Sequence, residues 1–434
     1  MMRGPLATTG TNAMQYFGLD FGTTNSSLAW VSPDGSVRLC DLDPLAPNLN
    51  VLRSLLYYSL DERGFVVGQR AIDEYLGETM QGTLIQSVKT FLADDSFVET
   101  FVHDRYYKLE DLIACFFHQV RQTIRTLTQD EAVLVVGRPA VFIDQPEREE
   151  LARGRMQRAA QLAKFYHVDF QFEPIAAGLT YESTLARPEL ALIGDFGGGT
   201  SDFTVMRLGA ADSLDRASDI LASSGVQIGG DTFDARIMDV KLTPQFGRDT
   251  TFRSMEGRQM PFPTHLLALL SRWHHIGFLR SQKTREQLRR IHYAANQPEL
   301  IEALQELVEG NYAFFLFREI ERAKAALSSR AEVSIRFHAE SIDIDETLRR
   351  DEFETLIAED LEVIRTTMRR ALRDAAVTPD AIDAVFLTGG SAQIPAVQRI
   401  FVDEFGPAKI RSQDYLTSVA FGLALDARRR SRQD

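Results

Sequence analysis

The sequence predicts an α/β protein built from two similar lobes. Chain length and an internal repeat lead to this prediction. The chain has 434 residues, and a single hydrophobic core rarely grows beyond about 250 to 300 residues. In the repeat, Gly18–Thr24 resembles Ile193–Thr200, and each segment lies between two short apolar runs. Such self-similarity is typical of a duplicated lobe, and here it places one Asp-Phe-Gly turn in each half.

The composition narrows the class of protein. Hydrophobic residues make up 44% of the chain and charged residues 25%, as in a packed globular protein. The net charge of −13 disfavours binding along a phosphate backbone, so no nucleic-acid partner is expected. No apolar run reaches the roughly 18 residues of a membrane helix, so no membrane partner is expected. Cys40 and Cys115 are predicted to be small buried hydrophobes.

Residues 1–13 are Gly/Thr-rich and lack an apolar signal core, so they are interpreted as a disordered leader and a cytoplasmic location is expected. Residues 14–188 are predicted to form lobe I, with an inserted subdomain at about 45–125. Tyr16–Asp20 and Leu28–Val31 are expected to form its first hairpin. Further strands are expected at Leu55–Leu60, Phe65–Val67, Ala132–Val136 and Phe170–Phe172, and helices at Leu109–Thr126, Pro146–Tyr166 and Ile175–Leu185.

Residues 189–415 are predicted to form lobe II, with an inserted subdomain at about 235–345. The strand–turn–strand pattern recurs at its start, and residues 231–330 are mainly helical. Strands are expected at Leu190–Gly194, Asp202–Leu208, Ser334–Phe337, Ser341–Ile344 and Ala384–Leu387, and helices at Asp351–Ala376 and Ile394–Phe405. Residues 416–434 are predicted to return to lobe I as a helix, Leu416–Ala427, followed by a basic tail.

The two glycine-containing turns suit phosphate binding. Phosphates need backbone N–H groups that can approach closely, which small residues permit. The glycines are Gly22, Gly197, Gly198 and Gly199, and hydroxyl donors are available from Thr23, Thr24, Thr200 and Ser201. Ligands bind at the carboxyl ends of strands in such folds, so the two turns are expected to face each other across a cleft. The chain contains no Gly-x-x-x-x-Gly-Lys-Ser/Thr, which excludes a P-loop.

Carboxylates beside these turns suit magnesium and water. Mg²⁺ prefers carboxylate and water oxygens, so Asp20 and Asp195 are expected to hold it through water, with Asp202 nearby. Glu173 follows a strand and is a candidate for orienting the water that attacks a terminal phosphate. Two alternatives remain open, because Asp202 could cap a turn and Glu173 could be an ordinary buried, hydrogen-bonded acid.

Together the motifs resemble those of the actin, hexokinase and heat-shock-70 superfamily, specifically the nucleotide-binding domain of the DnaK-type heat-shock protein 70 family. Six motifs occur in the family's order: Gly18–Asn25, Glu173–Ala177, Asp195–Asp202, Gly229–Asp234, Glu321–Ser329 and Gly389–Pro395. The resemblance spans about Tyr16 to Ala424 and implies an actin-like ATPase fold. In that fold a ribonuclease H-like motif is duplicated in two lobes with inserted subdomains. The Arg138-Pro139 pair and the chain length make it most similar to the YegD-like branch.

The resemblance implies ATP or ADP and Mg²⁺ as ligands. It assigns magnesium, water and catalysis to Asp20, Glu173, Asp195, Thr200 and Asp202. It assigns nucleotide contacts to Gly22, Thr23, Thr24, Asn25, Gly197, Gly198, Gly199, Thr200, Gly229, Gly230, Asp231, Glu321, Lys324, Ser328, Gly389, Gly390 and Ser391. From the residues alone, Glu321 and Lys324 could equally form an i,i+3 surface ion pair.

The chain also departs from the family pattern. Ile72 stands where the family has its catalytic lysine, and Arg70 or Lys89 are the nearby cations that could reach the site. Arginine is a poor replacement for a compact ammonium group, so fast hydrolysis is not expected. Ala325 and Gln393 replace two arginines that flank the adenine, and each lost stacking contact is worth about 0.5 to 2 kcal/mol.

The leading hypothesis is a chaperone-related, heat-shock-70-like ATPase without a peptide-binding domain. It would hydrolyse ATP slowly with magnesium, couple this to lobe closure, and act with a protein partner or co-chaperone. The first alternative is a non-hydrolysing nucleotide sensor or pseudoenzyme that acts on a protein partner. Further alternatives are a small-molecule kinase of the same superfamily and a filament-forming actin relative.

Overall fold

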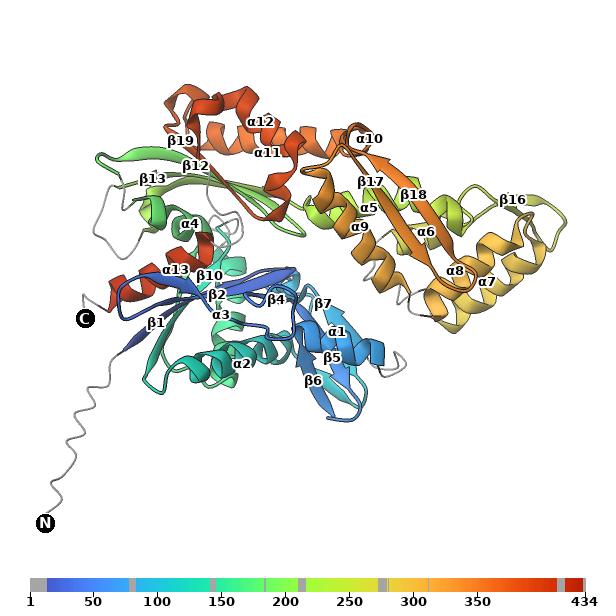
Figure 1. Ribbon diagram of the computed structural model, residues 1–434, viewed down its shortest axis with the longest axis horizontal. Coiled ribbons are helices and arrows are strands. Elements are labelled where there is room, and N and C mark those ends of the chain that lie inside the picture. Colours follow the sequence, from blue (N-terminus) through green and yellow to red (C-terminus); the bar gives the residue numbers. More distant parts are fainter. Residues whose placement is uncertain are drawn as a thin grey trace, which may run out of the picture. The chain divides into compact units, whose positions relative to one another are not determined.

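The structure is a computed structural model, and it describes residues 14–77, 83–140, 146–182, 185–209, 216–271, 279, 281–310, 312–411 and 418–431 (Figure 1). The predicted leader, residues 1–13, lies outside the described residues. The chain divides into two compact units. The first consists of Met1–Glu189, Met206–Leu221 and Leu416–Asp434, and the second of Leu190–Val205 and Ala222–Tyr415.

A mixed sheet forms the centre of the first unit. Its strands are β1 (Gln15–Phe21), β2 (Asn25–Val31), β3 (Val37–Leu39), β4 (Val51–Arg53), β10 (Ala132–Arg138) and β11 (Val168–Phe172). Their order is β11-β10-β1-β2-β3, and β4 also pairs with β2. β1 is antiparallel to β2 and parallel to β10, which is parallel to β11. The carboxyl ends of β1, β10 and β11 therefore lie along one edge, where Asp20 and Glu173 are found.

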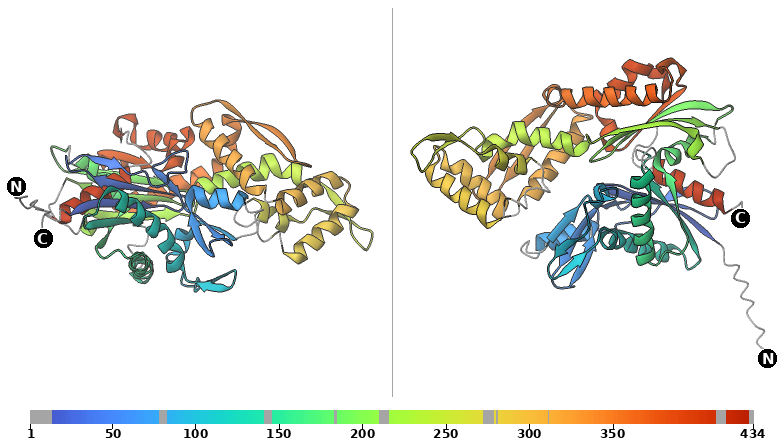
Figure 2. Two further views of the ribbon diagram at one scale, coloured as in Figure 1. Left: turned by 60° about the horizontal axis from the view of Figure 1, so that its bottom comes forward. Right: turned by 180° about the vertical axis from the view of Figure 1, so that it is seen from behind.

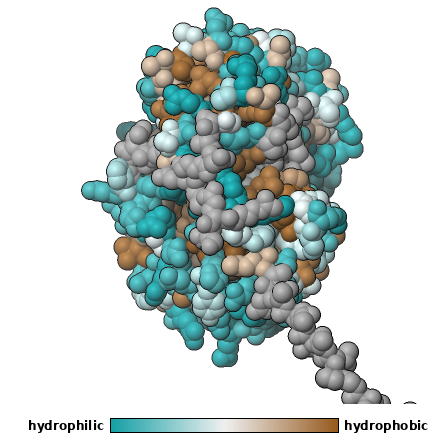
Figure 3. Space-filling model, turned by 90° about the vertical axis from the view of Figure 1, so that its left-hand side faces the viewer, coloured by the Kyte–Doolittle hydropathy of each residue, from teal (hydrophilic) through white to brown (hydrophobic). Residues whose placement is uncertain are grey.

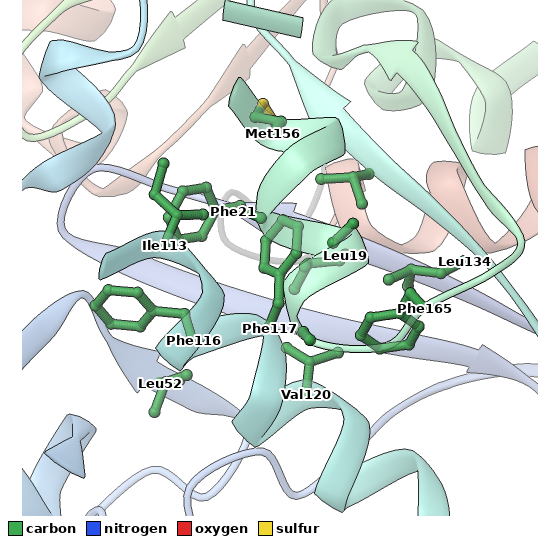
Figure 4. Close-up of a cluster of buried hydrophobic side chains, with 14 of the residues drawn as sticks. Leu19, Phe21, Leu52, Ile113, Phe116, Phe117, Val120, Leu134, Met156 and Phe165 are labelled. Atoms are coloured by element: carbon green, nitrogen blue, oxygen red, sulfur yellow. The ribbon is translucent and has the colours of Figure 1, made fainter. Parts of the chain in front are cut away.

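One face of this sheet carries the main hydrophobic core of the unit. The odd-numbered residues of β1, including Leu19 and Phe21, point to α2 (Leu109–Leu127) and α3 (Pro146–Leu162) (Figure 4). Phe21 packs against Phe116 and Phe117 at ring-centroid distances of 5.7 and 5.6 Å. This alternation, apolar at every second residue, is the period of a strand and fixes which face of β1 meets the helices.

The opposite face is covered by α4 (Glu173–Glu182) and by α13 (Ser418–Arg430), which is drawn in red beside β1 and β10 (Figures 1 and 2). Two glycines permit this close packing. A Cβ on Gly18 would collide with the backbone of Ala424, and a Cβ on Gly422 would collide with the carbonyl oxygen of Ala176. The end of the chain is thus joined closely to its first strand.

A small sheet of order β6-β5-β7 branches from the first unit. Its elements and those that follow are β5 (Leu55–Ser59), β6 (Gly64–Val67), α1 (Gly68–Gly77), β7 (Thr83–Gln86), the 3₁₀ turn η1 (Val88–Phe91), β8 (Thr100–Val102) and β9 (Arg105–Tyr107). Both cysteines lie in the first unit. Burial raises the pKa of Cys40 and of Cys115 to about 12, and neither forms a disulfide. The prediction that they are small, inert side chains is confirmed.

The central sheet of the second unit has the order β14-β13-β12-β19-β20. Its strands are β12 (Glu189–Phe196), β13 (Ser201–Leu208), β14 (Ile220–Val226), β19 (Ala384–Thr388) and β20 (Ile410–Arg411). β12 is parallel to β19, as β1 is to β10. Phe401 of α12 (Pro395–Phe405) packs on Phe196 and Phe203 at 5.8 and 6.2 Å between ring centroids. The matching strand order of the two sheets confirms the duplication predicted from the repeat.

The remaining elements of the second unit are mainly helical up to residue 327. They are α5 (Gly230–Ile237), η3 (Met238–Leu242), η4 (Thr243–Phe246), β15 (Thr251–Arg253), β16 (Gln259–Pro261), α6 (Thr264–Leu270), α7 (Gln282–Ala294), α8 (Pro298–Glu309), α9 (Ala313–Leu327), β17 (Glu332–His338), β18 (Asp343–Arg349), α10 (Arg350–Leu356), α11 (Ala358–Asp374) and η7 (Gly390–Gln393). The expected single helix Asp351–Ala376 is wrong, because Ile357 interrupts it and is fully buried. The expected strand end at Ile344 is also wrong, since β18 pairs with β17 through Arg349.

On the face shown in Figure 3, hydrophilic residues cover much of the coloured surface and hydrophobic residues gather in small groups. Among the described residues, no helix combines the length and apolarity needed to cross a bilayer.

The glycine contacts give a stability test. Gly422→Ala should lower the free energy of unfolding by about 1 to 3 kcal/mol, because the new methyl group meets backbone rather than a movable side chain. Gly154 in α3 is the matched control, since a Cβ there meets nothing within 4 Å. Gly154→Ala should leave stability unchanged or raise it by up to about 1 kcal/mol. Urea denaturation of the wild type and both variants measures the difference. Equal stability of the two variants would contradict the packing argument.

Candidate functional site

The first glycine turn connects β1 to β2. A Cβ on Gly22 would collide with the backbone oxygen of Asn25, so only glycine fits this turn. The buried Ser54 holds the turn from behind. Its backbone N–H donates to the Thr24 carbonyl at 2.8 Å, and its hydroxyl donates to the Gly22 carbonyl at 2.7 Å. Because the peptide bond is trans, the N–H of Thr23 points away from Ser54 and toward the outside of the turn.

The hydroxyl of Thr24 supports a ligand at this turn. Its oxygen is buried and makes no hydrogen bond in the structure. Buried polar atoms are nearly always paired with protein, water or ligand, so an unpaired one requires an explanation. A phosphate oxygen at the turn would supply the missing partner.

Glu173 lies two strands away on the same edge. It follows β11 directly and opens α4. Its side chain lies over Gly137 at the end of β10, where a Cβ would come within 3.0 Å of the Glu173 Cγ. The ammonium of Lys89 donates to Glu173 Oε1 at 2.7 Å, and both side chains are about nine-tenths buried. Within the first unit, Asp20, the Gly22 turn and the Lys89–Glu173 pair thus occupy the carboxyl ends of adjacent strands.

The second glycine turn connects β12 to β13 and is held by the start of α5. The N–H of Gly230 donates to the Gly197 carbonyl at 3.1 Å, and that of Asp231 donates to the Gly198 carbonyl at 2.8 Å. A Cβ on Gly229 would collide with the backbone of Gly198. Since both carbonyls face α5, the N–H groups of Gly198 and Gly199 point the opposite way, as a pair. Consecutive N–H groups on one side form a concave anion-binding nest.

Two further contacts fix the acids of this turn. The Thr388 hydroxyl donates to Asp195 Oδ1 at 2.8 Å, and the Thr200 hydroxyl donates to Asp202 Oδ2 at 2.9 Å. Gly389 has a φ of +82°, and a Cβ there would collide with the carbonyl oxygen of Phe196. The loop after β19 therefore packs against the turn after β12, at the shared carboxyl ends of two parallel strands.

A buried charge cluster lies behind the second turn. The Lys324 ammonium of α9 donates to Asp234 Oδ2 at 2.7 Å and to the Gly230 carbonyl at 2.8 Å. Burial raises the pKa of Asp234 to about 7, although Lys324 lowers it and Glu321 raises it further. A Cβ on Gly230 would lie 3.0 Å from the Ser391 hydroxyl. The partner of Lys324 is therefore Asp234, and the alternative of a Glu321–Lys324 surface pair is not the arrangement found.

The second unit thus gathers most of its predicted site residues. The residues linked by these contacts are Asp195, Gly197, Gly198, Thr200, Asp202, Gly229, Gly230, Asp231, Glu321, Lys324, Gly389 and Ser391. Ser328 lies one helical turn beyond Lys324 on the same face of α9. A Cβ on Gly390 would meet nothing within 4 Å, so open space adjoins this loop.

The donors suit a magnesium ion that keeps water ligands. No group of three or more His, Cys, Asp or Glu side chains in the described part of the chain could hold a metal ion directly. Mg²⁺ commonly uses one or two carboxylates together with waters and phosphate oxygens. Asp20 and Asp195, each at the end of a strand, fit that mode of binding.

Sequence reasoning missed several residues of these arrangements. Asp234 and Thr388 stood inside motifs that were recognised, but nothing in the sequence indicated which side chains they contact. Ser54 had no local signal, because its partners are backbone carbonyls 30 or more positions earlier in the chain. Of the two nearby cations, Lys89 reaches Glu173, whereas Arg70 pairs with Glu62 and Glu74 on an exposed face.

The fold and these turns define a two-lobe protein of the actin-like ATPase class. A family model described as "Hsp70 protein" matches residues 66–260 and 311–431, which is more than half of the chain. The chain therefore belongs to the Hsp70 family.

Curated relatives agree with this membership. "Chaperone protein DnaK" of Thermotoga neapolitana is 26% identical over 420 residues, covering 94% of this chain and 58% of the relative. The protein of the same name from Thermosipho africanus is 27% identical over 419 residues, with the same coverage. That from Deinococcus proteolyticus is 30% identical over 306 residues, covering 68% of this chain and 38% of the relative. The chain thus spans little more than half the length of the first two relatives.

The raised pKa of Asp234 predicts a pH dependence of stability. The folded state binds the Asp234 proton more tightly than the unfolded chain, whose ordinary value is 3.8. The resulting stabilisation is complete below that value and is lost as the pH rises through about 7. Asp234→Asn cannot titrate. The free energy of unfolding of the wild type, measured relative to this variant, should therefore fall between those two pH values and then level off. Parallel pH profiles from urea denaturation would contradict the raised pKa.

Proposed function

We propose that this protein binds one ATP with magnesium, using the glycine turn of each unit, and hydrolyses it slowly. The observation that carries the proposal is the repeated site. Each unit has a glycine turn after the same strand of the same five-strand order, and each turn has an aspartate beside it. A single Asp-Phe-Gly turn is weak evidence, but two in equivalent positions are difficult to explain by turn formation alone. Membership of the Hsp70 family supports the same ligand.

The contacts within each unit suggest how the labour is divided. The paired N–H groups of Gly198 and Gly199 suit phosphate oxygens, and the Gly22 turn offers the Thr23 N–H and the Thr24 hydroxyl. Lys324 and Ser391, with Glu321 and Ser328 on α9, would contact the nucleoside. Asp20 and Asp195 would hold the waters of a bound magnesium ion. Glu173 would accept a hydrogen bond from the attacking water, with Asp202 and Thr200 at the edge of the second turn.

The wider role that we propose is that of a chaperone-related ATPase in the cytoplasm. Closure of the two lobes around ATP would be its output, read by a protein partner or co-chaperone. The name shared by the relatives, "Chaperone protein DnaK", supports this role. The division of the lobes into inserted subdomains and the YegD-like branch stay predictions.

A second function, a non-hydrolysing nucleotide sensor, is favoured by one observation. Ile72, at the position of the family's lysine, is 1% exposed and packs within α1 against β5. An aliphatic side chain there cannot stabilise a phosphate. The sensor would bind ATP with the same residues and signal without turnover.

Asp195→Asn tests the assignment of the second turn. The amide oxygen can still accept from Thr388, so the fold should be retained while the negative charge is lost. Hydrogen bonds to charged groups contribute about 1.5 to 3 kcal/mol, so magnesium-dependent ATP binding or turnover should fall by about tenfold or more. Asp345→Asn is the control, because Asp345 forms only an exposed pair with Arg336. Calorimetric titration should give one ATP per wild-type chain. Unchanged binding and turnover in Asp195→Asn would count against the site.

A single-turnover experiment separates the ATPase from the sensor. Labelled ATP bound to excess wild-type protein with magnesium should be converted to ADP over minutes. Release of label without magnesium should be much slower, because the waters held by Asp20 and Asp195 would be missing. Intact ATP recovered after hours would instead establish the sensor.

A further inference from the structure

The ion pair between Lys89 and Glu173 is the starting point. The Lys89 Nζ lies 2.7 Å from Glu173 Oε1, and the side chains are only 10% and 8% exposed. Many ion pairs of the chain are far more exposed, for example Arg336–Asp345 at 64% and 57%. Burying two charges is costly, and a hydrophobic pair of the same size is often as stable. The position of this pair therefore calls for an explanation other than stability.

The turn that carries Lys89 is built to aim its side chain. Ser87, just before η1, has φ 57° and ψ 33°, a left-handed conformation that is strained for a serine. This residue redirects the chain as it leaves β7. Its N–H donates to the Ser54 carbonyl at 3.4 Å. Strained residues of this kind persist where the surrounding contacts fix them, and often where function requires it.

Ser54 joins the Lys89 turn to the first phosphate turn. Its carbonyl accepts from Ser87, its N–H donates to the Thr24 carbonyl, and its hydroxyl donates to the Gly22 carbonyl at 2.7 Å. One buried residue thus fixes the turn that holds Lys89 and the turn that is proposed to hold phosphate. The position of Lys89 is defined relative to that phosphate turn.

The other residues considered for this position do not carry the charge to Glu173. Ile72 is buried and apolar. Arg70 is committed to Glu62 and Glu74, and its side chain is 48% exposed. Lys89, in contrast, delivers a compact ammonium group to the acid that is proposed to orient water.

We propose that Lys89 is the positioning residue for Glu173 during ATP hydrolysis, in place of the lysine that is absent at Ile72. This inference rests on the proposed function. Lys89 keeps the Glu173 carboxylate charged and fixes one oxygen, which leaves the other to accept a hydrogen bond from water. The water oxygen then attacks the γ-phosphorus, the bond from phosphorus to the ADP oxygen breaks, and the water protons remain with the released phosphate.

A double-mutant cycle tests this role. Single-turnover rates are measured for the wild type, Lys89→Met, Glu173→Gln and the double variant, together with their ATP dissociation constants. Lys89→Met should slow hydrolysis by about tenfold to a hundredfold, as expected for loss of an oriented acid–base group, and should change the dissociation constant by less than about threefold. In the Glu173→Gln background the same substitution should slow hydrolysis by less than about twofold. Lys283→Met, at an exposed position of α7, should change neither quantity.

Each outcome has a distinct meaning. Losses that multiply in the double variant would overturn the inference, because Lys89 would then act independently of Glu173. A wild type that binds ATP but never hydrolyses it would also overturn the inference, while the binding part of the proposed function would stand. A wild type that does not bind ATP would overturn the proposed function itself. If Lys89→Met does not fold, as judged by thermal unfolding, Lys89→Gln is carried through the same cycle with the same criteria.

Discussion

The parallel pairing of a central strand with its neighbour is the constraint on which each unit depends. β1 pairs with β10, and β12 pairs with β19, in the same direction. Parallel strands bring their carboxyl ends to one edge, so residues far apart in sequence become neighbours there. Asp195 and Thr388 meet for this reason, although 192 residues separate them along the chain. The helices on the two faces of each sheet fix the strands but leave that edge to the turns.

Glycine allows the backbone to come close enough for these edges to work. Gly18 and Gly422 let α13 pack directly on β1 and α4, which ties the last helix to the strand that carries Asp20. Gly229 lets α5 dock on the second turn, and its first N–H groups then orient the turn's carbonyls. In both units the same economy applies: backbone contacts shape the site, and few side chains are spent on holding it.

The buried charges divide between the two kinds of chemistry that an ATPase needs. The Lys324–Asp234 pair braces the start of α5 and so the second turn, on the side proposed for the nucleoside. The Lys89–Glu173 pair lies at the end of the first sheet, on the side proposed for the attacking water. Ser54 connects this second pair to the Gly22 turn. Replacement of a lysine at Ile72 is thus accompanied by an ammonium group from another turn, held at the acid that needs it.

The sequence by itself determined the fold class, the duplication and the six motifs, because strand periodicity and glycine-rich turns are local patterns. It also placed Glu173 at the end of its strand. Only the tertiary structure decided that Lys89, and not Arg70, reaches Glu173, and that Lys324 pairs with Asp234 rather than Glu321. It alone showed that Ile357 interrupts the helix expected at Asp351–Ala376 and that Ser54 joins two turns. These outcomes depend on contacts between distant segments, and a side chain's partner across such a distance leaves no mark in its own neighbourhood of the sequence.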